Sequence, residues 1–112
     1  MTSEGPSGTS TDNGRNKFNR RKIDQLMEIE WGSSILKCPV RDIGPRGLFI
    51  LLVPPLWIGA TFSAHLMVDP PIHLICTVRR VEPGMGMGVS FSLHEDNADA
   101  RLDKLLTSLP MI

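Results

Sequence analysis

The sequence has 112 residues, with 12 Lys and Arg against 12 Asp and Glu, and 41% of its residues are hydrophobic. This length fits one domain with its own core, and a net charge of zero argues against a general nucleic-acid coat, which needs many cations to neutralise phosphates. The longest apolar segment, residues 48–58, is interrupted by two prolines and is too short to span a bilayer, and no secretory signal pattern opens the chain. We therefore expect a soluble, cytoplasmic protein that neither coats nucleic acid nor inserts into a membrane.

The composition changes abruptly along the N-terminal part of the chain. Residues 1–14 carry no apolar side chain after Met1, so we expect a disordered tail. A basic arm, residues 15–24, follows, and its opening RNKFNRRK holds five positive charges and no negative one. The arm can be interpreted as a solubilising segment or as an anion-binding one, because guanidinium groups bind phosphate in a bidentate manner and also pair with or stack on guanine.

From Met27 onward, apolar residues recur with period two, which is typical of strands that bury one face. Pro39 cannot donate a ladder hydrogen bond, so the second strand is expected to have an edge or a bulge there. Six short antiparallel strands favour a small barrel, because closure removes exposed strand edges. The predicted strands cover residues 27–31, 36–41, 48–53, 60–68, 72–78 and 86–93.

The pattern becomes helical near the C-terminus. One apolar stripe at helical spacing is formed by Ala98, Leu102, Leu105, Leu106 and Leu109. Pro110 ends the helix, and the stripe needs an apolar surface to pack on, for which the open end of the sheet is the nearest candidate. The predicted fold class is therefore all-β with a terminal helix: a six-stranded antiparallel β-barrel capped by a C-terminal α-helix.

The chain offers little catalytic chemistry. Catalysis needs a nucleophile with a base, paired carboxylates or a metal cluster. His65, His73 and His94 lack metal-ligand spacing and have no cysteine or acidic partner nearby in the sequence that would complete a zinc site. Cys38 and Cys76 fall on the apolar side of their strands and are expected to be buried free thiols. We predict no enzyme activity, no metal and no cofactor.

The turn at residues 40–47, VRDIGPRG, joins the second and third predicted strands. Its structural interpretation is a tight turn with proline and glycine where the backbone requires them. Its functional interpretation is an acceptor, Asp42, beside a loop whose missing side chains let a flat ligand approach the backbone. One carboxylate can accept hydrogen bonds from both N1–H and N2–H of a guanine edge. Neither the basic arm nor this turn is specific by itself.

Taken together and in this order, these segments resemble a PilZ domain over roughly residues 15–109. The basic arm stands in the place of the family's RxxxR segment, and DIGPRG at residues 42–47 in that of its D/N-x-S-x-x-G turn. VRRV at residues 78–81 and GMGVSF at residues 86–91 resemble the family's closing strands. The resemblance implies a PilZ-like domain over residues 15–112 that binds the bacterial second messenger cyclic di-GMP without catalysis.

The resemblance also implies the site residues. Arg20 matches the second arginine of the RxxxR segment, Asp42 the acidic residue of the turn and Gly47 its final glycine. The further candidate contacts to cyclic di-GMP are Arg15, Lys17, Arg21, Gly44 and Arg80. The sequence departs from the family pattern in two places, because Asn16 stands four residues before Arg20 and Gly44 replaces the serine of the turn.

Two hypotheses follow from the resemblance. In the first, the protein is a receptor and adaptor whose arm, residues 15–22, is mobile without ligand and becomes ordered on cyclic di-GMP, so that its surface signals to an unidentified protein partner in trans. The alternative is a degenerate PilZ module that does not bind the nucleotide and acts only through protein contacts, for example in motility or type IV pilus control.

Exposed apolar residues are the candidates for the partner surface, namely Trp57, Ile58 and Met85. A third class, a small barrel that binds single-stranded nucleic acid, needs aromatic platforms on a basic groove. The phase of Trp31, Phe62 and Phe91 along their strands predicts that these rings face the core, which disfavours that class.

Overall fold

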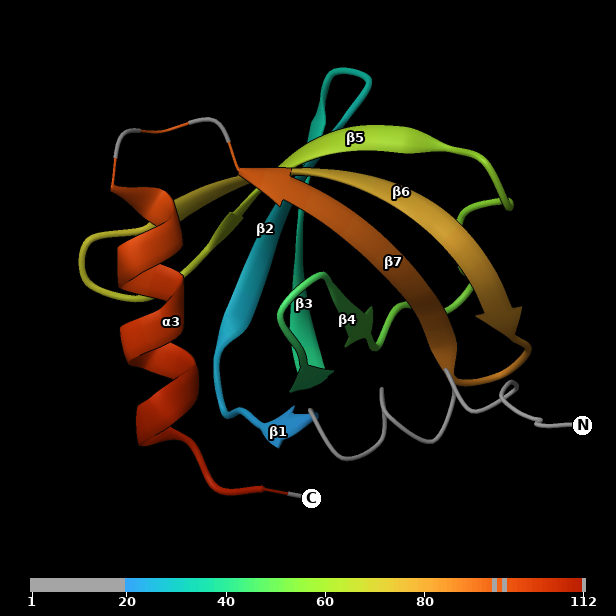
Figure 1. Ribbon diagram of the computed structural model, residues 1–112. Coiled ribbons are helices and arrows are strands. Elements are labelled where there is room, and N and C mark those ends of the chain that lie inside the picture. Colours follow the sequence, from blue (N-terminus) through green and yellow to red (C-terminus); the bar gives the residue numbers. More distant parts are fainter. Residues whose placement is uncertain (1–19, 94, 96, 112) are drawn as a thin grey trace, which may run out of the picture.

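The strands form one sheet that closes into a barrel (Figure 1). The computed structural model describes residues 20–93, 95 and 97–111. All strand pairings in this part of the chain are antiparallel, in the order β1-β3-β2-β5-β6-β7-β4, and β3 also pairs with β4, which closes a ring of six strands and confirms the predicted barrel. The strands are β1 (Arg21–Lys22), β2 (Leu26–Trp31), β3 (Ser34–Ile43), β4 (Gly47–Ile50), β5 (Thr61–Leu66), β6 (Ile72–Glu82) and β7 (Gly86–Leu93).

The apolar side chains that alternate along the strands fill the interior of the barrel. Met27, Ile29 and Leu74 have no exposed surface and belong to one contiguous core. Cys38 and Cys76 lie in the same core as free thiols, as predicted. Burial raises the pKa of the Cys76 thiol to about 12 and also raises the pKa of Cys38, because the thiolate loses its hydration inside the core. Both thiols are therefore held in their neutral, unreactive form.

The C-terminal helix, α3 (Ala98–Ser108), lies beside the barrel and packs one apolar face on it (Figure 1). The predicted stripe is confirmed, because each of its residues is buried or packed against the core: Ala98, Leu102, Leu105, Leu106 and Leu109. Within the described residues, no helix is both long and apolar enough to cross a membrane.

The third strand is shorter than the sequence predicts. β4 ends at Ile50, so the prediction that this strand reaches Val53 was wrong. The amide of Leu51 donates to the carbonyl oxygen of Pro39 at 2.9 Å, and Val53 is 61% exposed. The prediction failed because the apolar run continues past the strand, and apolar character alone does not mark a strand end. The two prolines that follow at residues 54 and 55 cannot donate to a ladder.

Strand β1 was not predicted. It pairs with β3, where Lys22 lies opposite Asp42, and the amide of Lys22 donates to the carbonyl oxygen of Pro110 at 2.9 Å. β1 therefore lies between β3 and the last residues of the chain. Arg21 and Lys22, which we expected to be mobile without ligand, are held by these contacts. Residues 1–19, which comprise the tail and the first part of the basic arm, lie outside the described residues.

Candidate functional site

A bulge in β3 brings Arg41 and Asp42 to the outer face of the barrel together. The pairing register of β3 with β4 shifts between Val40 and Asp42. Val40 and Ile43 both lie in the core, although residues three apart in a regular strand face opposite sides. Because Arg41 is the extra residue, it and its neighbour Asp42 both point away from the core.

Arg20 and Asp42 form the centre of the site. The guanidinium of Arg20 donates from Nε and Nη2 to Oδ1 of Asp42, at 2.8 and 2.5 Å, and from Nη1 to the carbonyl oxygen of Gly47 at 3.2 Å. The Asp42 side chain is only 7% exposed and that of Arg20 is 22% exposed. The predicted arginine of the arm and the predicted aspartate of the turn therefore lie in direct contact, although 22 residues separate them in sequence.

The turn between Gly44 and Gly47 closes on itself, and Gly47 lets it approach β7 closely. The amide of Gly44 donates to the carbonyl oxygen of Gly47 at 2.7 Å, which closes the turn. A Cβ atom on Gly47 would lie 2.7 Å from the carbonyl oxygen of Val89 and 3.7 Å from Nη1 of Arg20. Any larger residue at position 47 would therefore push β4 away from β7 or displace the arginine.

Arg41 completes the coordination of Asp42 and was missed in the sequence analysis. Its Nε donates to Oδ2 of Asp42 at 2.8 Å, its Nη1 lies 3.2 Å from the Met85 sulfur, and its Cζ lies 3.9 Å from the ring centroid of Phe49. Both carboxylate oxygens of Asp42 are thus occupied by guanidinium groups. The signal in the sequence was the three-residue spacing of the apolar residues Val40 and Ile43, which indicates a bulge.

A second bulge, in β6, brings Arg79 and Arg80 to the same side of the sheet. The register with β7 shifts between Val78 and Arg80, and Val78 is buried while Val81 packs against the core. The Nε of Arg79 donates to Oγ of Ser90 at 2.9 Å, so this arginine is held along β7. Arg80, which the family resemblance suggested as a ligand contact, turns toward β4 instead.

Gly88 makes room for the side chain of Arg80. A Cβ atom on Gly88 would lie 2.9 Å from Nε and 3.0 Å from Cγ of Arg80. Because that space is empty, the side chain lies over β7 and its Cζ reaches 5.2 Å from the ring centroid of Phe49. Phe49 lies opposite Asp42 in the register and shares its outer face, yet the ring has no exposed surface. Two guanidinium groups therefore cover one aromatic ring.

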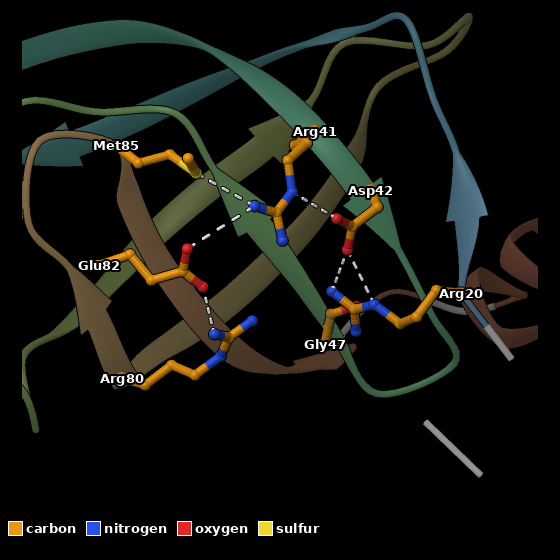
Figure 2. Close-up of polar contacts among 7 residues, drawn as sticks. All are labelled: Arg20, Arg41, Asp42, Gly47, Arg80, Glu82 and Met85. Atoms are coloured by element: carbon orange, nitrogen blue, oxygen red, sulfur yellow. Dashed lines mark hydrogen bonds and ion pairs between the residues drawn. The ribbon is translucent and has the colours of Figure 1, made fainter. Parts of the chain in front are cut away.

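Five charged side chains form an alternating chain across this face (Figure 2). The chain runs from Arg20 through Asp42, Arg41 and Glu82 to Arg80. Oε1 of Glu82 lies 3.9 Å from Nη1 of Arg41, and Oε2 of Glu82 accepts a hydrogen bond from Nη1 of Arg80. Three cations and two anions leave one net positive charge. The arrangement suits an anionic ligand with flat rings, because guanidinium groups bind phosphate and stack on aromatic rings.

Of the remaining predicted site residues, Arg21 lies in the described part of the protein, and it does not join this chain of charges. Arg21 points away and donates from Nη1 to the carbonyl oxygen of Leu109 at 3.1 Å, beyond the end of α3. Arg15 and Lys17 lie outside the described residues. Next to β1 lies an open depression of about 460 Å³, lined by Lys22, Ile23, Asp24, Arg41, Leu109 and Pro110.

The histidines form no metal site in the described part of the chain. The rings of His65 and His73 stack with centroids 4.8 Å apart, and Nε2 of His73 lies 2.6 Å from Oγ of Ser63. Among the described residues, no three or more His, Cys, Asp or Glu side chains are grouped so as to hold a metal ion. His94 lies outside these residues.

The protein is thus a closed six-stranded antiparallel barrel with a terminal helix, and an arginine–aspartate contact lies on its outer wall. The family model described as PilZ domain matches residues 14–108, so the chain belongs to the PilZ domain family, as the resemblance predicted. No curated protein matches the chain.

Solved structures support the same fold. Seven chains match, among them the Bacillus subtilis inhibitor of motility, MotI/DgrA, with a TM-score of 0.66 and 15% sequence identity. The match covers 83% of this chain and 49% of that one, so this chain spans about half the length of its structural neighbour. At this level of identity the likeness concerns the fold.

Proposed function

We propose that this protein is a non-catalytic receptor for cyclic di-GMP that signals to a protein partner in the cytoplasm. PilZ domains are receptor domains of a family that binds cyclic di-GMP, and residues 14–108 belong to that family. The observation that carries the proposal for this chain is the contact of Arg20 with both Asp42 and Gly47, since it joins the basic arm to the glycine-bearing turn in one site.

Each part of the site has a role in this proposal. Arg20, Arg41 and Arg80 supply charge for the two phosphates, and their planar groups stack on guanine. Asp42 accepts hydrogen bonds from N1–H and N2–H of a guanine edge. Before it can do so, a guanidinium group must release one of the Asp42 carboxylate oxygens. The turn between Gly44 and Gly47 offers backbone without side chains. Arg15, Lys17 and Arg21 are the arm's further candidates for phosphate contacts.

The alternative function, a degenerate module that acts only through protein contacts, is favoured by two observations. Both oxygens of Asp42 are already hydrogen-bonded within the protein, by Arg20 and Arg41. The sequence also lacks two of the family's ligand-binding groups, because Asn16 stands in place of the first arginine of the RxxxR segment and Gly44 has no hydroxyl for the ligand. A lost hydrogen bond to a charged group costs about 1.5–3 kcal/mol. Two such losses weaken binding by roughly two to four powers of ten, since about 1.4 kcal/mol is tenfold.

The proposed partner surface includes the apolar residues that the sequence analysis singled out. Trp57 and Ile58 are 65% and 64% exposed, and Met85 is 44% exposed. The ring of Trp57 packs edge-on against Trp31 with centroids 5.1 Å apart, so it is fixed on the surface rather than free. Met85 contacts Arg41 through its sulfur, so this residue lies beside the charged face.

Calorimetric titration with cyclic di-GMP tests the proposal. We expect saturable heat with the wild type and none with Arg20→Ala or Asp42→Ala. Arg101→Ala is the matched control, because this arginine lies on α3 and contacts the backbone of residues 70 and 71 instead. Equal heat in all four proteins would place binding elsewhere. No heat with the wild type at roughly 100 µM ligand, where even weak binding of about −5 to −6 kcal/mol is detected, would favour the alternative.

A further inference from the structure

Glu82 occupies the position between the two arginines that cover Phe49. One of its carboxylate oxygens lies 3.9 Å from Nη1 of Arg41, and the other accepts a hydrogen bond from Nη1 of Arg80 (Figure 2). Each arginine also stacks on the ring, with Cζ 3.9 and 5.2 Å from its centroid. Two guanidinium groups on one ring repel each other, and a carboxylate between them offsets that repulsion.

The backbone fixes Glu82 in this position while the arginines stay within reach of solvent. Glu82 is the last residue of β6, and its carbonyl oxygen accepts the amide of Met85 at 3.0 Å across a tight turn. The side chains of Arg41 and Arg80 are 39% and 58% exposed. An anion from solution can therefore reach both guanidinium groups, provided that the carboxylate yields its contacts.

We propose that Glu82 is an internal counterion that competes with the phosphate groups of the ligand for Arg41 and Arg80. This inference rests on the proposed function and concerns the regulation of the same site. A carboxylate and a phosphate accept hydrogen bonds from guanidinium groups in the same geometry, so one replaces the other. Glu82 thereby lowers the affinity of the site and sets the ligand concentration at which the arginines change partner.

The opposite role would be to position the arginines for the ligand. The two roles predict opposite signs for one substitution. If Glu82 competes, Glu82→Gln frees both cations, raises the net charge of the site by one and tightens binding. If Glu82 positions the arginines, the same substitution lets them move and weakens binding. Gln keeps the size of the side chain and can still accept a hydrogen bond, so the comparison isolates the charge.

Titration of cyclic di-GMP into Glu82→Gln, measured beside the wild type, decides between these signs. We expect about tenfold tighter binding, equivalent to about 1.4 kcal/mol, and a steeper loss of affinity with salt. Glu28→Gln is the matched control, since Glu28 forms a comparable exposed ion pair with Lys37 at 3.8 Å on another part of the barrel and should leave the affinity unchanged. If the wild type binds cyclic di-GMP, equal or weaker binding by Glu82→Gln overturns the inference.

A second titration separates this inference from the proposed function. The Nε–Hε signals of Arg41 and Arg80 are followed by NMR while inorganic pyrophosphate is added to the wild type and to Glu82→Gln. We expect half-saturation at a several-fold lower pyrophosphate concentration in the variant. If neither protein binds cyclic di-GMP but the variant shows this shift, the proposed function fails and the counterion role holds. Equal pyrophosphate curves for the two proteins overturn the counterion role.

Discussion

The regular and the bulged parts of the barrel show what a single extra residue does to a strand. Along β5 and the first half of β6, burial alternates without interruption, and outward side chains form hydrogen-bonded pairs across the two strands, such as Thr61 with Thr77 and Ser63 with His73. In the bulged part, by contrast, β3 and β6 each turn two consecutive residues outward, and the charged chain that results joins the basic arm to the far end of β6.

The side chains that stabilise the fold and those of the candidate site therefore lie in different parts of the barrel. The regular part contributes side chains to the core and little chemistry to the surface. The bulged part places Arg41 beside Asp42, so one residue holds the other on the outer face. A bulge also bends its strand, which helps to close the barrel. Substitutions in the two parts should therefore affect different measurements, and the predictions below test that division.

The largest expected effect is on stability and comes from the regular part. Leu74→Ala removes a side chain with no exposed surface from the core, and such a change costs about 2–5 kcal/mol of unfolding free energy. Urea denaturation followed by tryptophan fluorescence measures this loss. Ligand affinity of the folded variant should stay at the wild-type value, and a parallel loss of affinity would break the division between the two parts.

A pH-dependent effect on stability comes from Cys76, which has no exposed surface and lies in the core. Burial raises the pKa of its thiol from 9.0 to about 12, so the folded protein keeps the proton that the unfolded chain releases. The stability due to this group is therefore complete below pH 9 and is lost as the pH rises toward 12. Urea midpoints at pH 8, 9 and 10 measure the effect, and Cys76→Ala should show a shallower decline. Identical slopes for the two proteins would contradict it.

The smallest expected effect on stability comes from the bulged part. Gly88→Ala places a Cβ atom against the side chain of Arg80, which is flexible and 58% exposed and can move away at a cost below about 1 kcal/mol. The arginine should then leave the ring of Phe49. NMR should show a shifted Arg80 Nε–Hε signal and an almost unchanged urea midpoint. A large loss of stability would show that this face supports the fold as much as the core does.

The sequence allowed the six strands and the helix to be predicted because the period of burial is a local property. It also indicated Asp42 and Gly47, since a turn is local too. The placement of the Arg80 side chain could not be predicted in the same way, because it depends on the pairing of two strands and on the space left by a glycine of the neighbouring strand, Gly88. The role of Glu82 needs both bulges at once.

The short strand β1 was missed for a related reason. Two residues have no period, and the hydrogen bonds that hold them come from β3 and from Pro110, far along the chain. Apolar residues three apart, as in Val40 with Ile43 and Val78 with Val81, were the available sign that the alternation breaks. Had this spacing been used, Arg41 would have been predicted beside Asp42.

Two neighbouring arginines of the basic arm contact different parts of the protein. Arg20 is bound to Asp42, whereas Arg21 is bound to the carbonyl oxygen of Leu109, beyond the last turn of α3. The last turn of α3 contains no lysine or arginine of its own, so Arg21 of β1 supplies the positive charge that stabilises this end of the helix. The arginines that contact Asp42 and the end of α3 are thus adjacent in sequence, so a probe attached near residue 109 should report a change in the contacts of residue 42.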